Sequence, residues 1–455
     1  MPSGDDQKAR RAATGSVTRM PPGPRLPATL QTILYSRYRH RLFPLLRRHY
    51  GDAFTLRLTM PARRLVVLSD PDDIRTVFAG SGEALHAGEG NAIMGPALGR
   101  HSVLLADEDA HRRFRRLLMP VFSAAALRGY EGLVTELARA EAARWPRDRA
   151  FRVHPRMRAL TLETILRVVF GVTDRDRLAG MRPLVRALAD IGPITLLGLP
   201  YPALCRVGPW RPYVAAQRRL DELLYAEVAD RRRAPDLPER TDVLSRLVRA
   251  ASAGDDGLTD RELRDQMITL LLAGHETTAT ALAWTLHELA HDPSPLARAE
   301  RAADAGDDEY LAAVVKESLR LRPVVHEVAR VLTRPMTVAG HPLPAGATVM
   351  PAIGLVHGDA GHHPRPGCFH AERFAGAQPA AYTWIPFGGG ERRCLGAGFA
   401  LLEATVVLRE VLRRHHPRPA GRRREAQRAR NVTLVPARGA RLVMSARQAP
   451  ATARR

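Results

Sequence analysis

The sequence of 455 residues contains few cysteines and no long apolar run. Its three cysteines, Cys205, Cys368 and Cys394, are an odd number at wide spacing. This argues against a disulfide framework and favours a reducing compartment, which predicts a cytoplasmic protein. No run of eighteen apolar residues occurs, and residues 1–16 lack the apolar core of a signal peptide, so a soluble protein without a membrane anchor is expected.

Lysine and aromatic residues are also scarce, whereas arginine is abundant. Lys8 and Lys316 are the two lysines of the chain, so the formal net charge of +22 comes almost wholly from arginine. A basic protein attracts acidic partners, nucleic acid among them. However, the arginines are spread along the chain, aromatics make up 5% of it, and the densest arginine cluster, at 422–430, lacks aromatic residues for stacking. Nucleic-acid binding is therefore disfavoured, and an acidic protein partner is the better interpretation.

No linker or internal repeat divides the chain, which indicates one large domain. Residues 1–20 are polar, charged and small, and this composition predicts a disordered basic tail. A second disordered tail is predicted at 448–455. The folded domain is therefore expected to cover residues 21–447.

Helical spacing predominates within this domain. Amphipathic helices are predicted at 124–145, 156–170, 212–232 and 241–252. The longest predicted helix runs from Asp260 to about His291. It opens with a capping box formed by Thr259 and Glu262, and prolines follow its end. In its middle the segment AGHETT, Ala273–Thr278, interrupts good helix formers with glycine and two threonines, and such a weak point suggests a functional role.

Strand signals are short and local. Alternation around a turn predicts a β-hairpin at 52–68, followed by a helix from Pro71. Short β-like runs alternate with glycine and proline at 335–351, and a second hairpin is predicted at 431–444. The glycine-containing segment 84–101 is expected to form a long flexible loop, the kind of loop that often contacts substrate. The expected fold class is mainly α with small β-sheets.

The segment Phe387–Gly396, FGGGERRCLG, places Cys394 in a glycine-rich turn beside Arg392 and Arg393. The glycines allow the backbone to direct N–H groups at the sulfur, and the arginines favour the thiolate. A helix pattern follows from Phe399, and its N-terminus would further stabilise an anion. Cys394 is therefore a candidate metal ligand, although a buried, inert cysteine is the alternative for an isolated segment. No Cys or His companions stand at zinc spacing, which disfavours a structural zinc site.

Two further constellations precede this turn. In the predicted central helix, Glu276 and Thr277 offer an acid and a hydroxyl as proton relay groups, and Gly274 would admit a flat ligand. The alternative is a solvated glutamate beside a threonine bonded to its own helix turn. The ExxR pattern Glu317–Arg320 has little value alone, because this spacing is common in surface ion pairs. Its position among the other motifs makes it informative, because it stands between the central helix and the cysteine, and AERF follows it at 371–374.

Together these motifs resemble the cytochrome P-450 haem-thiolate monooxygenases over roughly residues 21–447. The segments FxxGxRxCxG at 387–396, AGxET at 273–277, ExxR at 317–320 and ERF at 372–374 occur in the order of that family. The resemblance implies the cytochrome P-450 fold, in which a long central helix crosses the catalytic domain over a buried haem. It also implies an oxidoreductase that activates dioxygen to hydroxylate or otherwise oxidise a hydrophobic small molecule.

The resemblance assigns roles to individual positions. Cys394 is implied as the axial ligand of the iron of haem b, and Glu276 and Thr277 as the catalytic pair that supplies protons to dioxygen. A buried structural charge network is implied for Glu317, Arg320 and Arg373. The implied haem contacts are His111, Arg115, Ala273, Gly274, Arg330, Phe387, Arg392 and Gly396. Among them His111, Arg115, Arg330 and Arg392 suit the haem propionates, with Arg112 and Arg116 as alternatives to Arg115.

The resemblance also implies partners. About sixty residues follow Cys394, too few for a flavin or nicotinamide domain, so electrons are expected from an acidic ferredoxin or flavodoxin and its reductase. A monomer is expected. Isomerisation or peroxide chemistry without external reductant is disfavoured by Glu276 and Thr277, and a haem-based gas sensor by the lack of an output domain. By analogy a mostly aliphatic substrate pocket is predicted from 84–101, 194–204, 268–272, 324–328 and the hairpin at 431.

Overall fold

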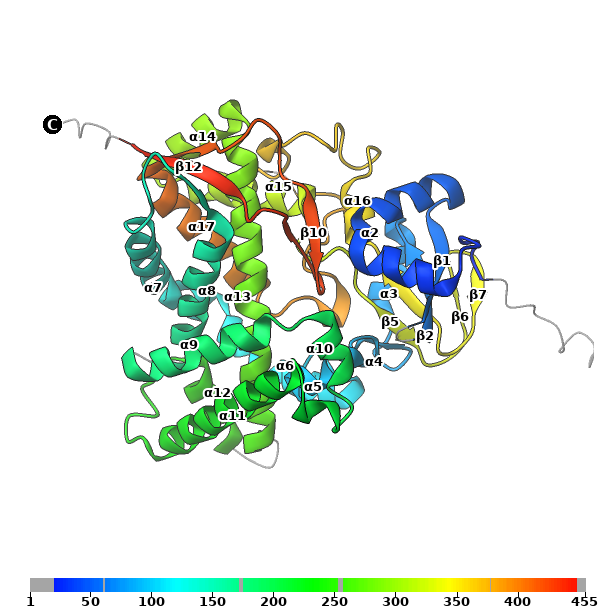
Figure 1. The fold of residues 1–455 in the computed structure, drawn as a ribbon, viewed down its shortest axis with the longest axis horizontal. Coiled ribbons are helices and arrows are strands. Elements are labelled where there is room, and N and C mark those ends of the chain that lie inside the picture. Colours follow the sequence, from blue (N-terminus) through cyan, green and yellow to red (C-terminus); the bar gives the residue numbers. More distant parts are fainter. Residues whose placement is uncertain (1–19, 60–61, 172–174, 253–256, 377, 448–455) are drawn as a thin grey trace, which may run out of the picture.

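The computed structural model describes residues 20–59, 62–171, 175–252, 257–376 and 378–447. Within these ranges helices predominate, and the strands form four small sheets (Figure 1). The predicted fold class, mainly α with small β-sheets, is confirmed. The predicted tails at 1–20 and 448–455 lie outside the described residues except for Met20, which packs against a buried apolar cluster that includes Val66 and Ile74.

The predicted amphipathic helices are confirmed as α7, α8, α11 and α12. The longer described helices are α2 (Ala28–Tyr50), α3 (Pro71–Ala79), α6 (Glu108–Leu118), α7 (Ala124–Ala142), α8 (Val153–Phe170), α9 (Arg175–Ala189), α11 (Trp210–Arg233), α12 (Val243–Ser252), α13 (Asp260–Ala290), α14 (Pro293–Ala305), α15 (Asp308–Leu321) and α17 (Ala397–Leu412). The short ones are α4 (Ala87–Gly90), α5 (Gly95–Leu98), α10 (Pro193–Gly198) and α16 (Ile353–His357), with 3-10 turns η1 (Ala92–Met94), η2 (Met119–Phe122), η3 (Leu204–Arg206), η4 (Ala371–Arg373) and η5 (Gly390–Arg392).

The predicted central helix is confirmed as α13, which passes through the middle of the molecule (Figure 1). Its capping box is present: the Glu262 amide donates to the Thr259 hydroxyl at 3.3 Å, and the Thr259 amide donates to the Glu262 carboxylate at 2.8 Å. The helix continues without a break through Ala273–Thr278. Most of its side chains are buried, because α8, α15 and α17 pack against it. This burial explains how one helix can carry threonines and a glycine at its centre and remain regular.

The largest described sheet contains the predicted hairpin at 52–68, and the helix predicted from Pro71 follows it as α3. Strands β1 (Ala53–Thr59) and β2 (Ala62–Leu68) pair antiparallel. The sheet continues from β2 to β8 (Thr348–Pro351), β5 (Arg330–Leu332) and β3 (Leu85–His86). The remaining sheets pair β6 (Met336–Val338) with β7 (His341–Leu343), β10 (Gln427–Arg430) with β11 (Thr433–Pro436), and β12 (Arg441–Ala446) with both β4 (Ala150–Arg152) and β9 (His415–Pro419).

The hairpin predicted at 431–444 is wrong, because its two strands belong to different sheets. Strand β11 pairs with β10, and β12 pairs with β4 and β9. The turn between them is held by Glu425, whose carboxylate accepts hydrogen bonds from the amides of Arg438, Ala440 and Arg441 at 2.8 to 3.1 Å. These bonds replace the ladder that a hairpin would have formed.

The expectation of a long loop at 84–101 is also wrong. The segment consists of β3, α4, η1 and α5 in succession. The Asp107 carboxylate accepts hydrogen bonds from the amides of Gly88 and Glu89 at 2.9 and 3.0 Å, which satisfies the free N–H groups at the start of α4. An acid outside the segment therefore provides the order that its composition did not predict.

Two acids of α17, Glu403 and Glu410, are both almost without exposed surface but differ in their surroundings. The Glu410 carboxylate lies 2.9 Å from Arg139 Nε and 2.7 Å from Arg414 Nη1, whereas Glu403 Oε1 has no hydrogen-bond partner among the described residues. Burial raises the pKa of Glu403 to about 8, and the Thr164 hydroxyl only partly opposes this. Burial also acts to raise the pKa of Glu410, but the hydrogen bonds from the two arginines lower it below its ordinary value.

We expect Glu403→Gln to stabilise the protein increasingly as pH rises. A pKa raised on folding means that protonated Glu403 contributes stability below the ordinary value of 4.5, and this stability is lost as pH rises through about 8. The neutral amide avoids that loss, with a gain of up to a few kcal/mol at about 1.4 kcal/mol per pKa unit. Thermal unfolding of wild type and variant at several pH values measures the difference.

The matched control is Glu410→Gln on the same helix. Because its pKa is lowered on folding, Glu410 contributes stability above 4.5 that is lost as pH falls. This variant should therefore be destabilised at neutral pH, and the difference from wild type should shrink in acid. The same sign of effect for both substitutions would contradict the electrostatic explanation.

Candidate active site

The cysteine turn, Phe387–Gly396, contains η5 and leads into α17, and α3 packs against it. The Cys394 amide donates to the Phe387 carbonyl at 2.9 Å and closes the turn. Gly390 has a φ of 65°, and a Cβ at this position would lie 1.9 Å from the Phe78 carbonyl oxygen of α3. Both observations require glycine at this position. Phe387 packs edge-on against Trp384, which fixes the start of the turn.

The Cys394 side chain is exposed, yet protein atoms surround its sulfur closely enough for burial to raise the pKa of the thiol. The two observations agree if the sulfur lies on the wall of a recess. The Gly396 amide and the guanidinium groups of Arg115 and Arg393 oppose the burial effect and favour the thiolate. The sulfur is therefore accessible to a ligand and lies among donors that stabilise its charged form.

Four basic side chains from three segments surround this turn. His111 and Arg115 come from α6, Arg330 begins β5, and Arg392 ends η5. Arg115 Nη1 donates to the Arg393 carbonyl at 2.8 Å, which joins α6 to the cysteine turn. The structure thus brings together residues that stand far apart in the sequence.

Arg115 differs from Arg112 and Arg116, its neighbours on α6, in its burial and its contacts. Arg112 is exposed and pairs with Asp109 at 2.5 Å, and Arg116 is also exposed. Arg115 is partly buried, and its charge interacts with Cys394. Of the three arginines left open by the sequence, Arg115 is therefore the one that contacts the cysteine turn.

The basic cluster carries more positive charge than the protein around it compensates. Burial, and then Arg392, lowers the pKa of Arg330 to about 10. Burial lowers the pKa of His111 to about 4, with further contributions from Arg392, Arg115 and Arg330. Asp107, which pairs with Arg392 at 2.5 Å, is the acid that opposes both shifts. A cluster of this kind suits a ligand that carries carboxylates.

The middle of α13 presents two different faces. Ala273 and Thr277 lie one helical turn apart on the less buried face, and the Thr277 hydroxyl donates to the Ala273 carbonyl at 2.7 Å. Gly274 faces α8, because a Cβ at this position would lie 3.0 Å from Ile165 Cδ1. A side chain at Gly274 would therefore point toward α8, and the contact of this glycine's backbone with a flat ligand stays a prediction.

Glu276 is buried and paired, which rules out the solvated alternative. Arg158 Nε of α8 lies 2.5 Å from its Oε2, and Arg430 Nη1 of β10 donates to its Oε1 at 3.0 Å. Burial raises the pKa of Glu276, while Arg158 and Arg430 act to lower it. Sequence reasoning did not identify Arg158 and noted Arg430 only as one member of the basic cluster at 422–430.

Glu317 and Arg320 lie on α15, and Arg373 of η4 lies beside them. Arg320 binds the Glu317 carboxylate in two places, at 2.7 and 2.8 Å, and donates to the carbonyls of His357 and Cys368. Arg373 Nε lies 3.5 Å from Glu317 Oε1. Both members of the Glu317–Arg320 pair are almost fully buried. The pair therefore joins α15 to the segments that lead into the cysteine turn.

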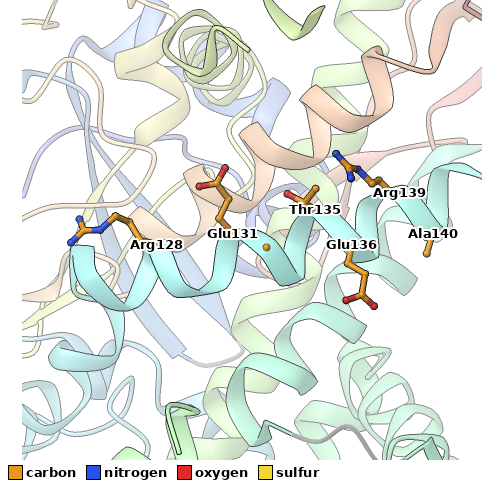
Figure 2. Close-up of a pocket in the computed structure, with 7 residues that line it drawn as sticks. Arg128, Glu131, Thr135, Glu136, Arg139 and Ala140 are labelled. Carbon is orange, nitrogen blue, oxygen red and sulfur yellow. The ribbon is translucent and has the colours of Figure 1, made fainter. Parts of the chain in front are cut away.

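A separate hollow runs along the outer face of α7, and Figure 2 shows Glu131, Thr135 and Arg139 along it. All its lining residues come from this one helix, and none belongs to the predicted site. Two of its charged residues pair with α17, since Glu131 lies 3.1 Å from Arg409 and Arg139 lies 2.9 Å from Glu410. The hollow is therefore part of the solvated surface and not the candidate site.

Comparison with known proteins identifies the family. The family model for cytochrome P450 matches residues 20–443. The chain belongs to the cytochrome P450 family. It is 48% identical to cytochrome P450 135A1 of Mycobacterium tuberculosis over 431 residues, which cover 94% of this chain and 96% of that protein. It is also 48% identical to cytochrome P450 135B1 of Mycobacterium bovis over 440 residues, 95% of this chain and 93% of that protein.

Two solved cytochrome P450 structures share the fold. One is the cyanobacterial CYP120A1 with bound retinoic acid, with a TM-score of 0.81, 23% identity and coverage of 94% of this chain and 100% of that one. The other is the haem domain of cytochrome P450DA, also with a TM-score of 0.81 and 23% identity, over 95% of this chain and 99% of that one. The predicted P-450 fold is thus confirmed. No helix within the described ranges combines the length and apolar character needed to cross a membrane.

Family membership establishes this protein as a haem monooxygenase, an oxidoreductase with haem b as its cofactor. The residues of the candidate site fit that group. A single accessible sulfur among amide and guanidinium donors suits an iron ligand, and the uncompensated charge of Arg330 and its neighbours suits two propionates.

We expect Glu317→Ala to destabilise the cytochrome P450 by about 3–5 kcal/mol, because it leaves Arg320 buried without its carboxylate partner. Loss of haem should accompany the loss of stability, since the network supports the cysteine turn. Chemical denaturation and the haem absorbance per protein measure the two effects.

The control is Glu136→Ala, which removes the acid of another ExxR pattern on the exposed surface. Glu136 lies 3.7 Å from Arg167, and its side chain is 70% exposed. It should cost less than about 1 kcal/mol and leave the haem content unchanged. Normal haem content in Glu317→Ala would contradict the assigned role of the network.

Proposed function

We propose that this cytochrome P450 oxidises a hydrophobic small molecule with electrons delivered by separate acidic proteins. The observation that carries the proposal is the convergence of one accessible thiol and four basic side chains at the cysteine turn. The site residues take the roles that the family resemblance implies for them, and Cys394 would ligate the haem iron. When bound, the haem supplies the activation of dioxygen.

The basic cluster holds and orients the cofactor. Arg115, Arg330 and Arg392 supply charged N–H donors to the propionates, and His111 supplies a neutral ring, since burial lowers its pKa to about 4. Phe387 and Gly396 belong to the turn that fixes the sulfur, and the Gly396 amide acts on the sulfur itself. Orientation of the cofactor thus follows from groups on α6, β5 and η5 acting together.

The middle of α13 supplies and transfers protons. Ala273 and Thr277 face the open side of the helix, so the Thr277 hydroxyl can exchange its bond to the Ala273 carbonyl for one to a bound molecule. Glu276 holds a proton more readily than an ordinary glutamate, because burial raises its pKa. The Glu276 carboxyl and the Thr277 hydroxyl together provide a donor and a transfer group on adjacent residues.

An apolar substrate is supported by the side chains of the segments predicted to line its pocket. Val325 and Val328 are partly buried, and Val325 forms an isolated bridge with Thr433 beside β11. The solved CYP120A1 structure, which is described as bound to retinoic acid, offers an analogy for a largely apolar ligand in this fold. Screening hydrophobic compounds for the spin-state change of the haem tests the proposal, and exclusive binding of strongly polar compounds would contradict it.

A redox partner is proposed to dock beside the cysteine turn. Arg112 and Arg116 on α6 and Arg393 in the turn are exposed, and together with the partly buried Arg115 they outnumber the nearby acids Glu83, Asp109 and Glu391. Positive charge at this position favours an acidic ferredoxin or flavodoxin and accelerates its association.

Reduction of the haem by an acidic ferredoxin should slow as ionic strength rises, because salt screens attraction between exposed charges. Stopped-flow reduction at a series of salt concentrations measures the rate. Arg393→Gln should lower the rate at low salt, whereas Arg211→Gln, an exposed arginine on α11, should not. Reduction that is independent of salt would exclude electrostatic docking.

The thiolate ligand is tested by the carbon monoxide difference spectrum of the reduced protein. Wild type should show the red-shifted band of a thiolate-ligated haem, and Cys394→His should lose it while still binding haem. Cys368→Ser is the matched control, because Cys368 is also exposed and should retain the band. A red-shifted band in Cys394→His would refute the proposed ligand.

A further inference from the structure

Asp190, which lies directly after α9, shares its cationic partners with Glu276. Its Oδ1 forms ion pairs with both Arg158 and Arg430. The same two arginines hold the Glu276 carboxylate, at 2.5 Å and 3.0 Å. One exposed acid and one buried acid are thus joined through two guanidinium groups.

The four residues come from four different elements. Glu276 lies on α13, Arg158 on α8, Arg430 on β10, and Asp190 on the link between α9 and α10. A second contact attaches the same link, since Asn431 Nδ2 donates to the Ile191 carbonyl at 2.9 Å. The α9–α10 link is therefore fastened to the end of β10 at two successive residues.

Other ionisable groups around Glu276 have little capacity to replace this arrangement. His154 Nε2 lies 3.6 Å from Glu276 Oε1, but burial lowers the pKa of His154 to about 3. His275 is also buried, with a pKa of about 4. The titratable and charged groups that face Glu276 from the packed elements are His154 and Arg158 on α8, Arg428 and Arg430 on β10, His275 on α13, and Asp190.

We propose that Asp190 and Glu276 share the two cations Arg158 and Arg430. Through this sharing, the position of the α9–α10 link affects the charge state of Glu276. This inference rests on the proposed role of Glu276 as a proton donor. The link would make Asp190, Arg158 and Arg430 positioning residues for proton supply.

The physical argument concerns shared donors. Each guanidinium N–H that bonds to Asp190 is unavailable to Glu276, and the negative charge of Asp190 opposes ionisation of Glu276. With the α9–α10 link in place, Glu276 is more easily protonated. If the link moves away, both arginines turn fully to Glu276 and hold it as a carboxylate. Proton supply from Glu276 would then be favoured only while Asp190 of the α9–α10 link pairs with Arg158 and Arg430.

Two substitutions should shift the pKa of Glu276 in opposite directions. Asp190→Asn removes an anion and releases the arginines, so the pKa of Glu276 should fall by about one unit. Arg430→Gln removes a cation, so this pKa should rise by a similar amount, and Arg158→Gln provides a second variant with the same expected direction. A general loosening of the fold would instead shift both kinds of variant in the same direction.

The readout is the infrared carbonyl band of the protonated Glu276 carboxyl, identified by its absence in Glu276→Gln and titrated with pH in the resting holoenzyme. This measurement does not depend on turnover. Opposite shifts in Asp190→Asn and Arg430→Gln would support the proposal. No shift in Asp190→Asn, or shifts of the same sign in both, would overturn it.

Asp230→Asn provides the matched control. Asp230 on α11 is as exposed as Asp190, at 51% against 49%, and pairs with Arg177 of α9 at 3.1 Å. Its loss weakens the attachment of α9 without touching Glu276, so the titration should match that of wild type. A shift equal to that of Asp190→Asn would overturn the proposal, because it would show that loosening α9 is sufficient.

The proposed function is tested separately by coupling, the product formed per electron pair consumed. Glu276→Gln and Thr277→Ala should lower coupling if these residues supply protons. Unchanged coupling in both, together with opposite infrared shifts, would refute the proton relay and leave the electrostatic link supported. Lowered coupling without those shifts would overturn the link and leave the relay intact.

Discussion

A buried carboxylate must be matched by cations, and this requirement organises the half of the molecule around α13. Glu276 pairs with Arg158 and Arg430. Three turns further along the helix, Glu288 pairs with Arg322 at 2.9 Å and with Arg424. Arg424 and Arg430 belong to the densest arginine cluster of the sequence, so part of this cluster holds the C-terminal segment against the central helix. Its pairing within the fold also explains why a basic stretch here needs no nucleic acid.

At the cysteine turn, by contrast, the charges are not balanced within the protein. Here cations exceed acids, and Asp107 is the internal anion that acts on Arg330 and His111. The charges around Glu276 and Glu288 are therefore balanced within the protein. Those at the cysteine turn are balanced only when an anionic ligand is bound. The net charge of +22 does not distinguish the two regions, because each contains several arginines. Only the arrangement of the acids in space separates structural arginines from those available to a cofactor.

The sequence allowed prediction where the decisive contacts were local. The capping box at Thr259, the helix spacing and the bond from the Cys394 amide to the Phe387 carbonyl each depend on neighbours within a few residues. Prediction failed where a distant acid decided the structure, as Asp107 does for α4 and Glu425 for the turn before β12. Arg158 was missed for the same reason, because no pattern within the chain connects it to a glutamate on another helix. The comparisons confirm the family and its cofactor, whereas the roles of individual site residues remain proposals.

The bond from Arg115 to the Arg393 carbonyl joins residues 278 positions apart. Gly390 likewise fits beneath Phe78 of α3, so the cysteine turn obtains its shape from the first quarter of the chain. During synthesis the early segments must therefore remain without this partner until residue 393 has been made. The basic cluster and the cysteine turn thus cannot come together, and cannot hold a ligand jointly, before that point.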